Sequence, residues 1–544
     1  MGIEYDRYKQ QYSELSEFIL PWRGRFTPDD VNRGAKKGSK IINNHATLAA
    51  RTQAAGMMSG ITSPARPWFQ LITPDPELNV QKEVRVWLSD VQTILLQIFG
   101  RSNIYNALHN TYAEIGTFGT SAMIVLEDWD SVMRAHSFTV GEYRLATSDK
   151  NIVDTLYREQ HITVKQAVDQ FGKKVSKTTQ GLYDKGQYDS RITICHMIEP
   201  NSDGKSAQYE EIKQDFAFRS IYYEKGTDAE QYLKVSGFEE QALIAPRWES
   251  IGGDTYSSKC PGKECLDDIK ELQFIEKQKK KAIEKMVDPP MVGPESLKNS
   301  PSNTLAGGVT FVDAANQDAG FRPAYQVQYR VAEALEDIRK VEDRISKTYY
   351  EDLFMMLANS DRRQITAREV EERHEEKLLG LGPVLERLND ELLDPLIDRA
   401  FGIAQRAEIL PPPPEQLQDM DLRVEYISIM AQAQKAIGVA GIEDTINFAS
   451  MVAQVDPEAL RRVNLSKAIE VYAGMKGIDP KLLRDDKELE KEAAEAKQEA
   501  AMQSLMEQAP AMAGAAQDLG NTPVEGGGSA LDAMLPGGPQ AEMI

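Results

Sequence analysis

The chain has 544 residues and a formal net charge of −21, with 63 Lys and Arg against 84 Asp and Glu. This balance excludes a protein that coats nucleic acid non-specifically, because such a protein needs a basic surface to neutralise phosphates. Only three cysteines are present, which excludes a disulfide scaffold and favours a reducing compartment. We expect a soluble intracellular protein, since the first residues lack a signal-peptide layout and no apolar run approaches the roughly 18 residues of a spanning helix.

Three helical segments are predicted before residue 120. Apolar residues at helical spacing mark residues 4–20, and Pro21 ends this helix. A second helix over 42–60 is rich in alanine and glycine, and small residues let another helix approach closely. The third stretch, 78–116, is helical with a break near Gly100.

The pattern changes between residues 121 and 262. Short runs rich in Val, Ile, Thr and aromatic residues alternate there with turn signals such as Asp203-Gly204. Such runs predict a β-rich region, and the only helix that we expect within it covers residues 163–171.

Two charged amphipathic helices are predicted over 263–288 and 329–358, and the second would be about 45 Å long. Acids dominate the first half of the first helix, and five bases follow: Lys277, Lys279, Lys280, Lys281 and Lys285. This order complements the helix dipole, so a solvated helix is the simplest interpretation. The intervening residues 289–328, rich in Pro, Gly and Asn, predict a compact insert with a few short strands.

A polar loop follows the second of these helices. It comprises Asn359, Ser360, Asp361, Arg362, Arg363 and Gln364. Thr366 and Glu369 have the spacing of a capping box and predict a third long helix, bent or broken at residues 380–383 and at Pro395.

The rest of the chain divides into a spacer, a helical region and a tail. Four prolines at 411–414 predict a stiff spacer, and residues 415–507 have a helical pattern throughout. Residues 508–544 contain no Lys or Arg and many glycines, which predicts a disordered acidic tail.

A search for catalytic motifs returns none with the required spacing. Residues 34–40 do not match a P-loop, and residues 56–60 do not match a nucleophile elbow. Cys260 and Cys265 resemble half of a zinc knuckle, but a structural zinc site needs four ligands, so we interpret them as ordinary reduced thiols. We therefore predict no enzyme, no metal and no cofactor.

The order of the elements predicts an α+β fold. The long amphipathic helices would bury their apolar stripes either in an ordinary core or against copies of the same chain. Periodicity alone does not decide between these two interpretations.

Four segments carry a resemblance to a known family. They are Pro21-Trp22-Arg23-Gly24-Arg25-Phe26, the small-residue stretch 54–69, the charged helix from Leu266 to Asp288-Pro289-Pro290, and residues 363–370. In this order they resemble the head-to-tail connector (portal) proteins of short-tailed, podovirus-type bacteriophages. The resemblance covers residues 10–505, nearly the whole chain.

The resemblance implies a portal fold that assembles into a ring of about twelve chains. It places an N-terminal helical part of the wing at 1–120 and a β-rich wing at 121–262. Two stem helices at 263–288 and 329–358 would flank a small clip at 289–328. The remaining parts would be a channel loop and long wing helix at 359–410, a helical crown at 411–507 and the disordered tail at 508–544.

The resemblance also implies a conduit for double-stranded DNA at one capsid vertex, in a virion component assembled in the host cytoplasm without a membrane. The implied partners are the major capsid protein, the scaffolding protein, the terminase large subunit and a tail adaptor protein. An acidic ring suits DNA passage, because a bore that bound phosphates tightly would hold the DNA. The five stem lysines and Arg362-Arg363 are candidates for weak DNA contact, with dipole compensation and ion pairs between subunits as the alternatives.

Two other classes of protein compete with this interpretation. A helical scaffolding or adaptor protein would assemble heads without a DNA channel, and it would lack the helix–insert–helix arrangement. An enzyme would need an active site that the motif search does not detect.

Overall fold

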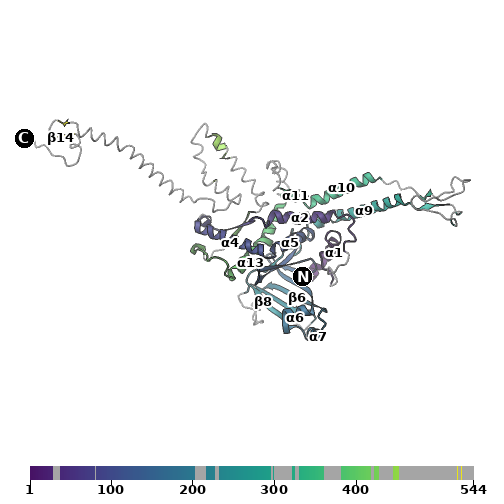
Figure 1. The fold of residues 1–544 in the computed structure, drawn as a ribbon, viewed down its shortest axis with the longest axis horizontal. Coiled ribbons are helices and arrows are strands. Elements are labelled where there is room, and N and C mark those ends of the chain that lie inside the picture. The colour runs from purple at the N-terminus through teal and green to yellow at the C-terminus, as the bar shows by residue number, and fades with distance from the viewer. Residues whose placement is uncertain are drawn as a thin grey trace, which may run out of the picture. The chain divides into compact units, whose positions relative to one another are not determined.

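The computed structural model (Figure 1) describes most of the chain up to residue 427. The described ranges are 1–27, 37–79, 81–201, 216–226, 232–293, 322–324, 330–359, 381–417 and 422–427, with short pieces at 295, 298, 445–446, 448–452, 468, 523–524 and 528–529. The residues group into two units, Met1–Ala440 and Gly441–Ile544.

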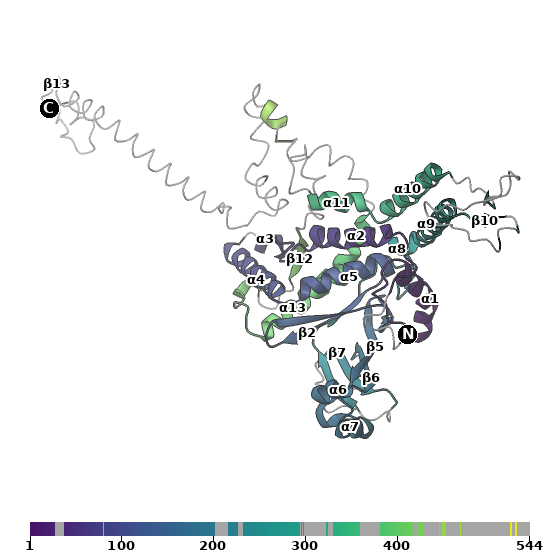
Figure 2. The same ribbon diagram turned by 45° about the vertical axis from the view of Figure 1, so that its right-hand side comes forward.

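Helices make up the N-terminal part of the first unit, as the sequence predicts. They are α1 (Gly2–Phe18), α2 (His45–Ile61), the short α3 (Pro76–Asn79), α4 (Lys82–Arg101) and α5 (Ile104–Phe118). The break predicted near Gly100 lies at residues 102–103, where the chain turns between α4 and α5. Figure 2 shows α2 and α5 side by side above the sheets.

Two antiparallel sheets follow α5. A three-stranded sheet has the order β3-β2-β9, with β2 (Ala122–Asp128), β3 (Val132–Phe138) and β9 (Leu243–Ile244). A five-stranded sheet runs in chain order through β4 (Tyr143–Thr147), β5 (Val153–Thr163), β6 (Arg191–Pro200), β7 (Phe218–Glu224) and β8 (Tyr232–Phe238). A shorter pair joins β1 (Phe69–Ile72) to β12 (Arg423–Tyr426).

The predicted helix near 163–171 is present as α6 (Val164–Phe171). Thr163 caps it in a capping box with Gln166, which satisfies two backbone amides at the helix start. A 3₁₀ turn, η1 (Gly172–Lys174), and a helix that we did not predict, α7 (Lys177–Asp184), continue from it.

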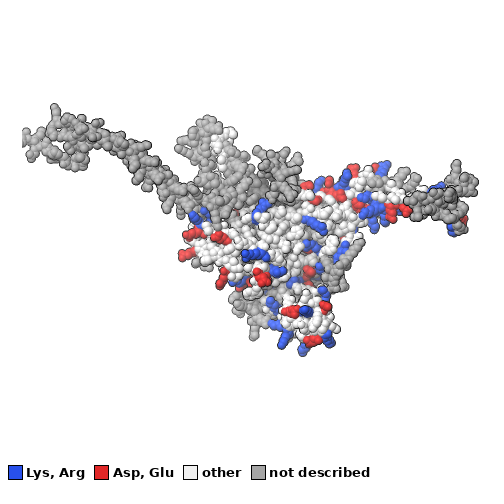
Figure 3. All heavy atoms as spheres, in the orientation of Figure 1, with Lys and Arg blue, Asp and Glu red and all other residues white. Residues whose placement is uncertain are grey.

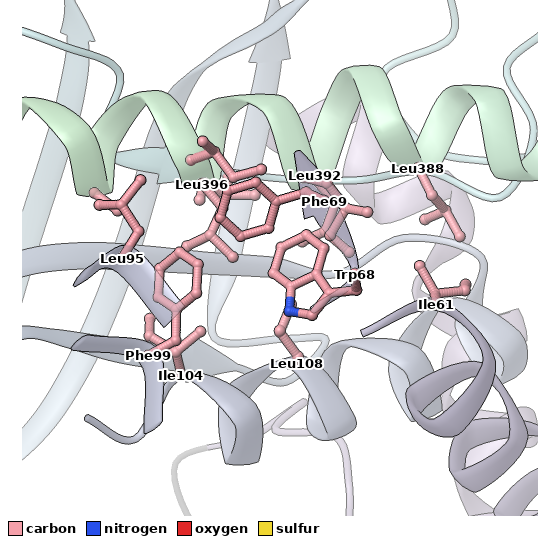
Figure 4. Packing of buried hydrophobic residues seen from close by; sticks show 14 of the residues in the cluster. Ile61, Trp68, Phe69, Leu95, Phe99, Ile104, Leu108, Leu388, Leu392 and Leu396 are labelled. Atoms are coloured by element: carbon pink, nitrogen blue, oxygen red, sulfur yellow. The ribbon is translucent and has the colours of Figure 1, made fainter. Parts of the chain in front are cut away.

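The core has two large apolar clusters, and α2 contributes to both. Ala46, Ala49 and Ala50 pack with α1 and the sheets, while Ala54 and Met57 pack with α4, α5 and the helical residues 381–406. Figure 4 shows the second cluster, where Leu388, Leu392 and Leu396 point from one helix toward Trp68 and Phe69. This arrangement places α2 between the two cores.

Small residues let neighbours approach α2, as the sequence predicts. A Cβ atom at Gly56 would lie 2.3 Å from the Cβ of Phe354, which is buried on α11 (Glu351–Asn359). The helix α5 also packs on α2, and a Cβ atom at Gly116 of α5 would lie 2.0 Å from Oε1 of Gln53 of α2. At Gly56 the space is closed by the Cβ and ring of Phe354, so a larger side chain would force a shift, whereas at Gly116 the contact is with the end of a flexible glutamine.

The structure differs from the prediction of one helix over 329–358. The chain instead forms α10 (Val331–Thr348) and α11, separated at Tyr350, which has a φ of 54°. The buried Tyr349 lies at the end of α10, and the amide of Tyr350 donates to the carbonyl of Lys347 at 3.1 Å. This left-handed turn lets α11 lie along α2, while α10 contacts both α2 and α9 (Leu266–Val287) and packs mainly on α9.

The α-helix is interrupted next to Pro395, as predicted: the π turn η5 (Asn389–Leu393) ends directly before α13 (Asp394–Arg406), and Pro395 lies in the first turn of α13, where its missing N–H is not needed. Two other expectations need correction. The helical pattern of 415–507 is wrong at β12, which follows the 3₁₀ turn η6 (Glu415–Leu417) and pairs with β1. Within the second unit, the predicted tail contains a short strand pair, β13 (Pro523–Val524) with β14 (Gly528–Ser529).

Replacing Gly56 by alanine should destabilise the first unit, because the new methyl group overlaps Phe354. We expect a loss of about 1–3 kcal/mol, measured as a lower midpoint of chemical unfolding. Gly100→Ala is the matched control: this helical glycine has no atom near its Cβ position, so the substitution should be neutral or stabilising by up to about 1 kcal/mol. Equal midpoints for the two variants would contradict the close approach of α11.

Candidate functional site

A helical hairpin projects from the body of the first unit (Figures 1 and 2). We use this name for α9, α10 and the strand pair between them. A short helix, α8 (Pro261–Glu264), leads into α9, and β10 (Met291–Val292) pairs antiparallel with β11 (Arg322–Pro323) before the chain returns through α10. The predicted insert of 289–328 otherwise lies outside the described residues.

The root of the hairpin is fixed by the buried amide of Gln273. Its Oε1 accepts hydrogen bonds from the backbone amides of Ile42, at 2.6 Å, and Asn43, at 2.9 Å. Its Nε2 donates to the carbonyl of Asn43 at 2.8 Å. One side chain thereby satisfies three backbone groups of the segment that leads into α2, and α9 is held to the body.

The second helix of the hairpin is attached to the same segment. The side-chain Nδ2 of Asn43 donates to Oε1 of Glu342 of α10 at 2.8 Å, and Nε2 of His45 lies 2.8 Å from the Ser346 hydroxyl. Between the helices, Arg344 pairs with Asp268 and Glu271, each at 2.8 Å. The hydrogen bond to Asp268 raises the pKa of Arg344, so this exposed guanidinium stays charged.

The apolar stripe of the hairpin is buried at its root and exposed farther out. Leu272, Val341 and Ile345 are buried. Large apolar side chains are exposed toward the other end: Ile283, Met286, Val287, Met291, Val292 and Leu335. Val287 keeps 80% of its surface, and Phe274, next to Gln273 at the root, keeps 62%. A contiguous element with this many exposed apolar side chains is typical of a protein–protein interface.

The five predicted stem lysines all lie on α9, within this outer part. Lys277, Lys280, Lys281 and Lys285 are exposed. Lys279 is partly buried and its ammonium lies 2.9 Å from Glu276. Figure 3 shows Lys and Arg gathered on the side of the hairpin where α9 runs. Of the predicted channel loop, Asn359 is the last residue of α11, and residues 360–364 lie outside the described residues.

The two cysteines that flank α8 are buried in the core. Cys260 and Cys265 are free thiols, both buried. Burial raises the pKa of both, to about 11 for Cys260, so each is protonated at neutral pH. Among the residues that the structure describes, no group of three or more His, Cys, Asp or Glu is placed to hold a metal ion. None of the described helices has the length and apolarity needed to cross a bilayer.

Sequence reasoning placed the five lysines on a helix, as observed, but missed the residues that position this helix. Gln273 and Asn43 are separated by 230 positions in the chain and belong to no motif. Helical periodicity predicted that all apolar residues of the stripe are equally buried. No local signal distinguishes Leu272, which is buried, from Ile283, which is exposed.

Comparison with known proteins agrees with this architecture. The family described as bacteriophage head to tail connecting protein matches residues 2–483. The chain is 43% identical over 514 residues to the portal protein of Salmonella phage epsilon15, an alignment that covers 94% of this chain and 91% of that relative. It is 44% identical over 484 residues to the probable portal protein of Bordetella phage BPP-1, with 89% and 87% covered.

The chain therefore belongs to the family of bacteriophage head to tail connecting proteins. Its function is that of a phage portal protein, a structural component of the virion and not an enzyme.

Replacing Gln273 by leucine should loosen the root of the hairpin. The amides of Ile42 and Asn43 would lose their acceptor while staying largely buried, which costs about 2 kcal/mol or more. We expect a lower unfolding midpoint and faster hydrogen exchange at these two amides. The same substitution at the exposed Gln278, five positions along α9, is the control and should change neither quantity. Unchanged exchange in Gln273→Leu would contradict the bracing role.

Proposed function

We propose that this portal protein closes into a ring of about twelve copies, with the helical hairpins side by side around an axial channel. The observation that carries this proposal is the hairpin itself. Its root is braced by Gln273, yet its outer part exposes Ile283, Met286 and Val287. An element that is held rigidly while its apolar surface faces solvent is suited to packing against a neighbouring copy.

In this proposal the parts of the chain have distinct positions in the ring. The helices at 263–288 and 329–348 form the stem, and 289–328 forms the clip, whose base is the β10–β11 pair. The helices before residue 120 and the β-rich part at 121–262 form the wing. The residues 359–365 form the channel loop, and 411–507 form the crown.

The partners follow from the position of such a ring. As a head-to-tail connector, the protein contacts the capsid and the tail. In this proposal the major capsid and scaffolding proteins bind around the wing, and a tail adaptor protein binds the clip. The terminase large subunit docks on the portal while the head is assembled in the host cytoplasm.

The ring is tested by placing charge on the exposed part of the hairpin. The double variant Ile283→Asp, Met286→Asp should raise the protein concentration needed for ring formation at least about tenfold, because two buried carboxylates would lie between subunits. Sedimentation velocity and electron micrographs measure the ring fraction.

The control carries the same change at two apolar residues that are similarly exposed outside the hairpin, Ile152→Asp and Ile251→Asp. It should assemble like the wild type. Wild-type protein that stays monomeric at high concentration over several salt conditions would rule out the ring itself.

The stem lysines are proposed to contact passing DNA weakly. Lys277, Lys280 and Lys281 are exposed on α9, and in a ring they would repeat around the channel of an otherwise acidic protein. Loosely held ammonium groups favour transient contact, since close pairs of charges in water gain only about 1 kcal/mol.

Neutralising these three lysines to glutamine should leave rings intact and reduce the amount of DNA in each head. The control replaces three exposed lysines of α6 and α7 instead, Lys165, Lys177 and Lys185, which gives the same change in net charge. Genome per head is measured in an infection that carries only the variant. Normal filling by the stem variant would remove the DNA-contact role, and loss of rings would assign these lysines to ion pairs between subunits.

A further inference from the structure

The turn between β2 and β3 presents a tryptophan to solvent. Trp129 is fully exposed, at 105% of its reference surface, although tryptophan is among the residues most often buried at interfaces. Ile124 and Leu126 of β2 pair with His136 and Arg134 of β3 in continuous register, so the hairpin that carries Trp129 is regular up to its tip.

The tip is held in one conformation. The Ser131 amide donates to Oδ2 of Asp128 at 3.0 Å, and the Ser131 hydroxyl lies 2.7 Å from the same oxygen. Val132 has a φ of 68°, which a β-branched residue rarely adopts. At the base, Arg406 of α13 pairs with Glu127 at 2.9 Å. Asp128 and Ser131 fix the backbone of this turn, so Trp129 is presented at a defined point of the surface, which suits it as an anchor.

The opposite end of β3 borders a cleft of about 670 Å³. Phe138, the last residue of β3, is in its lining, with the guanidinium of Arg158 4.4 Å from the ring centroid. This size lies within the range of about 300–1,000 Å³ of pockets that enclose a ligand group. Phe138 itself is only 6% exposed beneath this guanidinium, so the cleft offers an inserted indole the Arg158 guanidinium as a cation–π partner.

The cleft is basic in an acidic protein. Its charged lining consists of four arginines and two glutamates: Arg25, Arg144, Arg158, Arg191, Glu142 and Glu159. Both carboxylates have a basic partner, because Lys225 lies 2.7 Å from Glu159 and Nε of Arg25 lies 3.8 Å from Glu142. The lining therefore carries a formal excess of two positive charges. The tip has the opposite sign, since Asp128 and Asp130 flank Trp129.

The tip does not reach the cleft of its own chain. Trp129 precedes β3, the cleft lies at the far end, and the seven residues of this strand span about 20 Å. Backbone pairing through the edge strand is also restricted, because Asn103 bonds both backbone groups of Ala135, at 2.7 and 2.9 Å. Side-chain insertion from another molecule remains the available mode of docking.

We propose that Trp129 of one subunit inserts into this basic cleft of the neighbouring subunit, with Asp128 and Asp130 facing its arginines. Trp129 and the cleft lie at opposite ends of β3, so the contact between subunits is head-to-tail. Repeated head-to-tail contacts close into a ring when the rotation between neighbouring subunits permits closure. The inference rests on the proposed ring and adds a second contact to it, remote from the helical hairpin.

Crosslinking of co-expressed chains tests the inference directly. One chain carries Asp130→Cys, which keeps Trp129, and the other carries Ser137→Cys, in the cleft, so a short bismaleimide can join them only between subunits. The three native thiols are buried and give little background. We expect a covalent dimer from rings of this mixture, and none when Ser137→Cys is replaced by Thr93→Cys on the exposed side of α4.

Assembly of a single variant gives an independent readout. Trp129→Ser should raise the concentration required for rings at least about tenfold, whereas Ile3→Ser, which removes another exposed apolar side chain, should not change it. Two results together would overturn the inference and leave the proposed function standing: Trp129→Ser forms rings normally, and the mixed rings with introduced cysteines give no crosslink. Wild-type protein that never forms rings would overturn both.

Discussion

The architecture depends on how closely other helices approach α2. This helix contributes to both large core clusters, and its small residues set the distance to α5 and α11. Phe354 occupies the space left by Gly56, and Gln53 occupies the space left by Gly116. The segment leading into α2 then binds Gln273 and Glu342, so the orientation of the projecting hairpin follows from the same packing.

Ion pairs attach the leucine-rich helical residues 381–406 to the β-layer. Arg399 is buried and pairs with Glu240, while Arg247, also buried, pairs with Glu391 in the π turn. Breaking such a pair leaves a buried charge without compensation, which is costly. The helix therefore keeps one position over the core, although its sequence contains a proline and a turn of irregular geometry.

The hairpin is buried and hydrogen-bonded at its root, whereas its outer part exposes apolar side chains. Near the body Leu272, Val341 and Ile345 are buried and Gln273 is hydrogen-bonded, whereas farther out Ile283 and Val287 face solvent beside a group of lysines. The ring proposed above would cover this apolar surface with another copy of the chain.

Length, periodicity and composition alone determined the α+β class, the helical N-terminal part, the β-rich middle and the two charged helices around an insert. These features are local, because each depends on the spacing of residues within one segment. The tertiary structure decided the rest. It broke the second charged helix at Tyr350, since α11 packs on α2 while α10 packs mainly on α9, and it made residues 423–426 a strand because β1 supplies its partner. It also selected which half of the apolar stripe is buried and brought Gln273 to residues 42–43, because contacts between distant segments leave no periodic trace in the sequence.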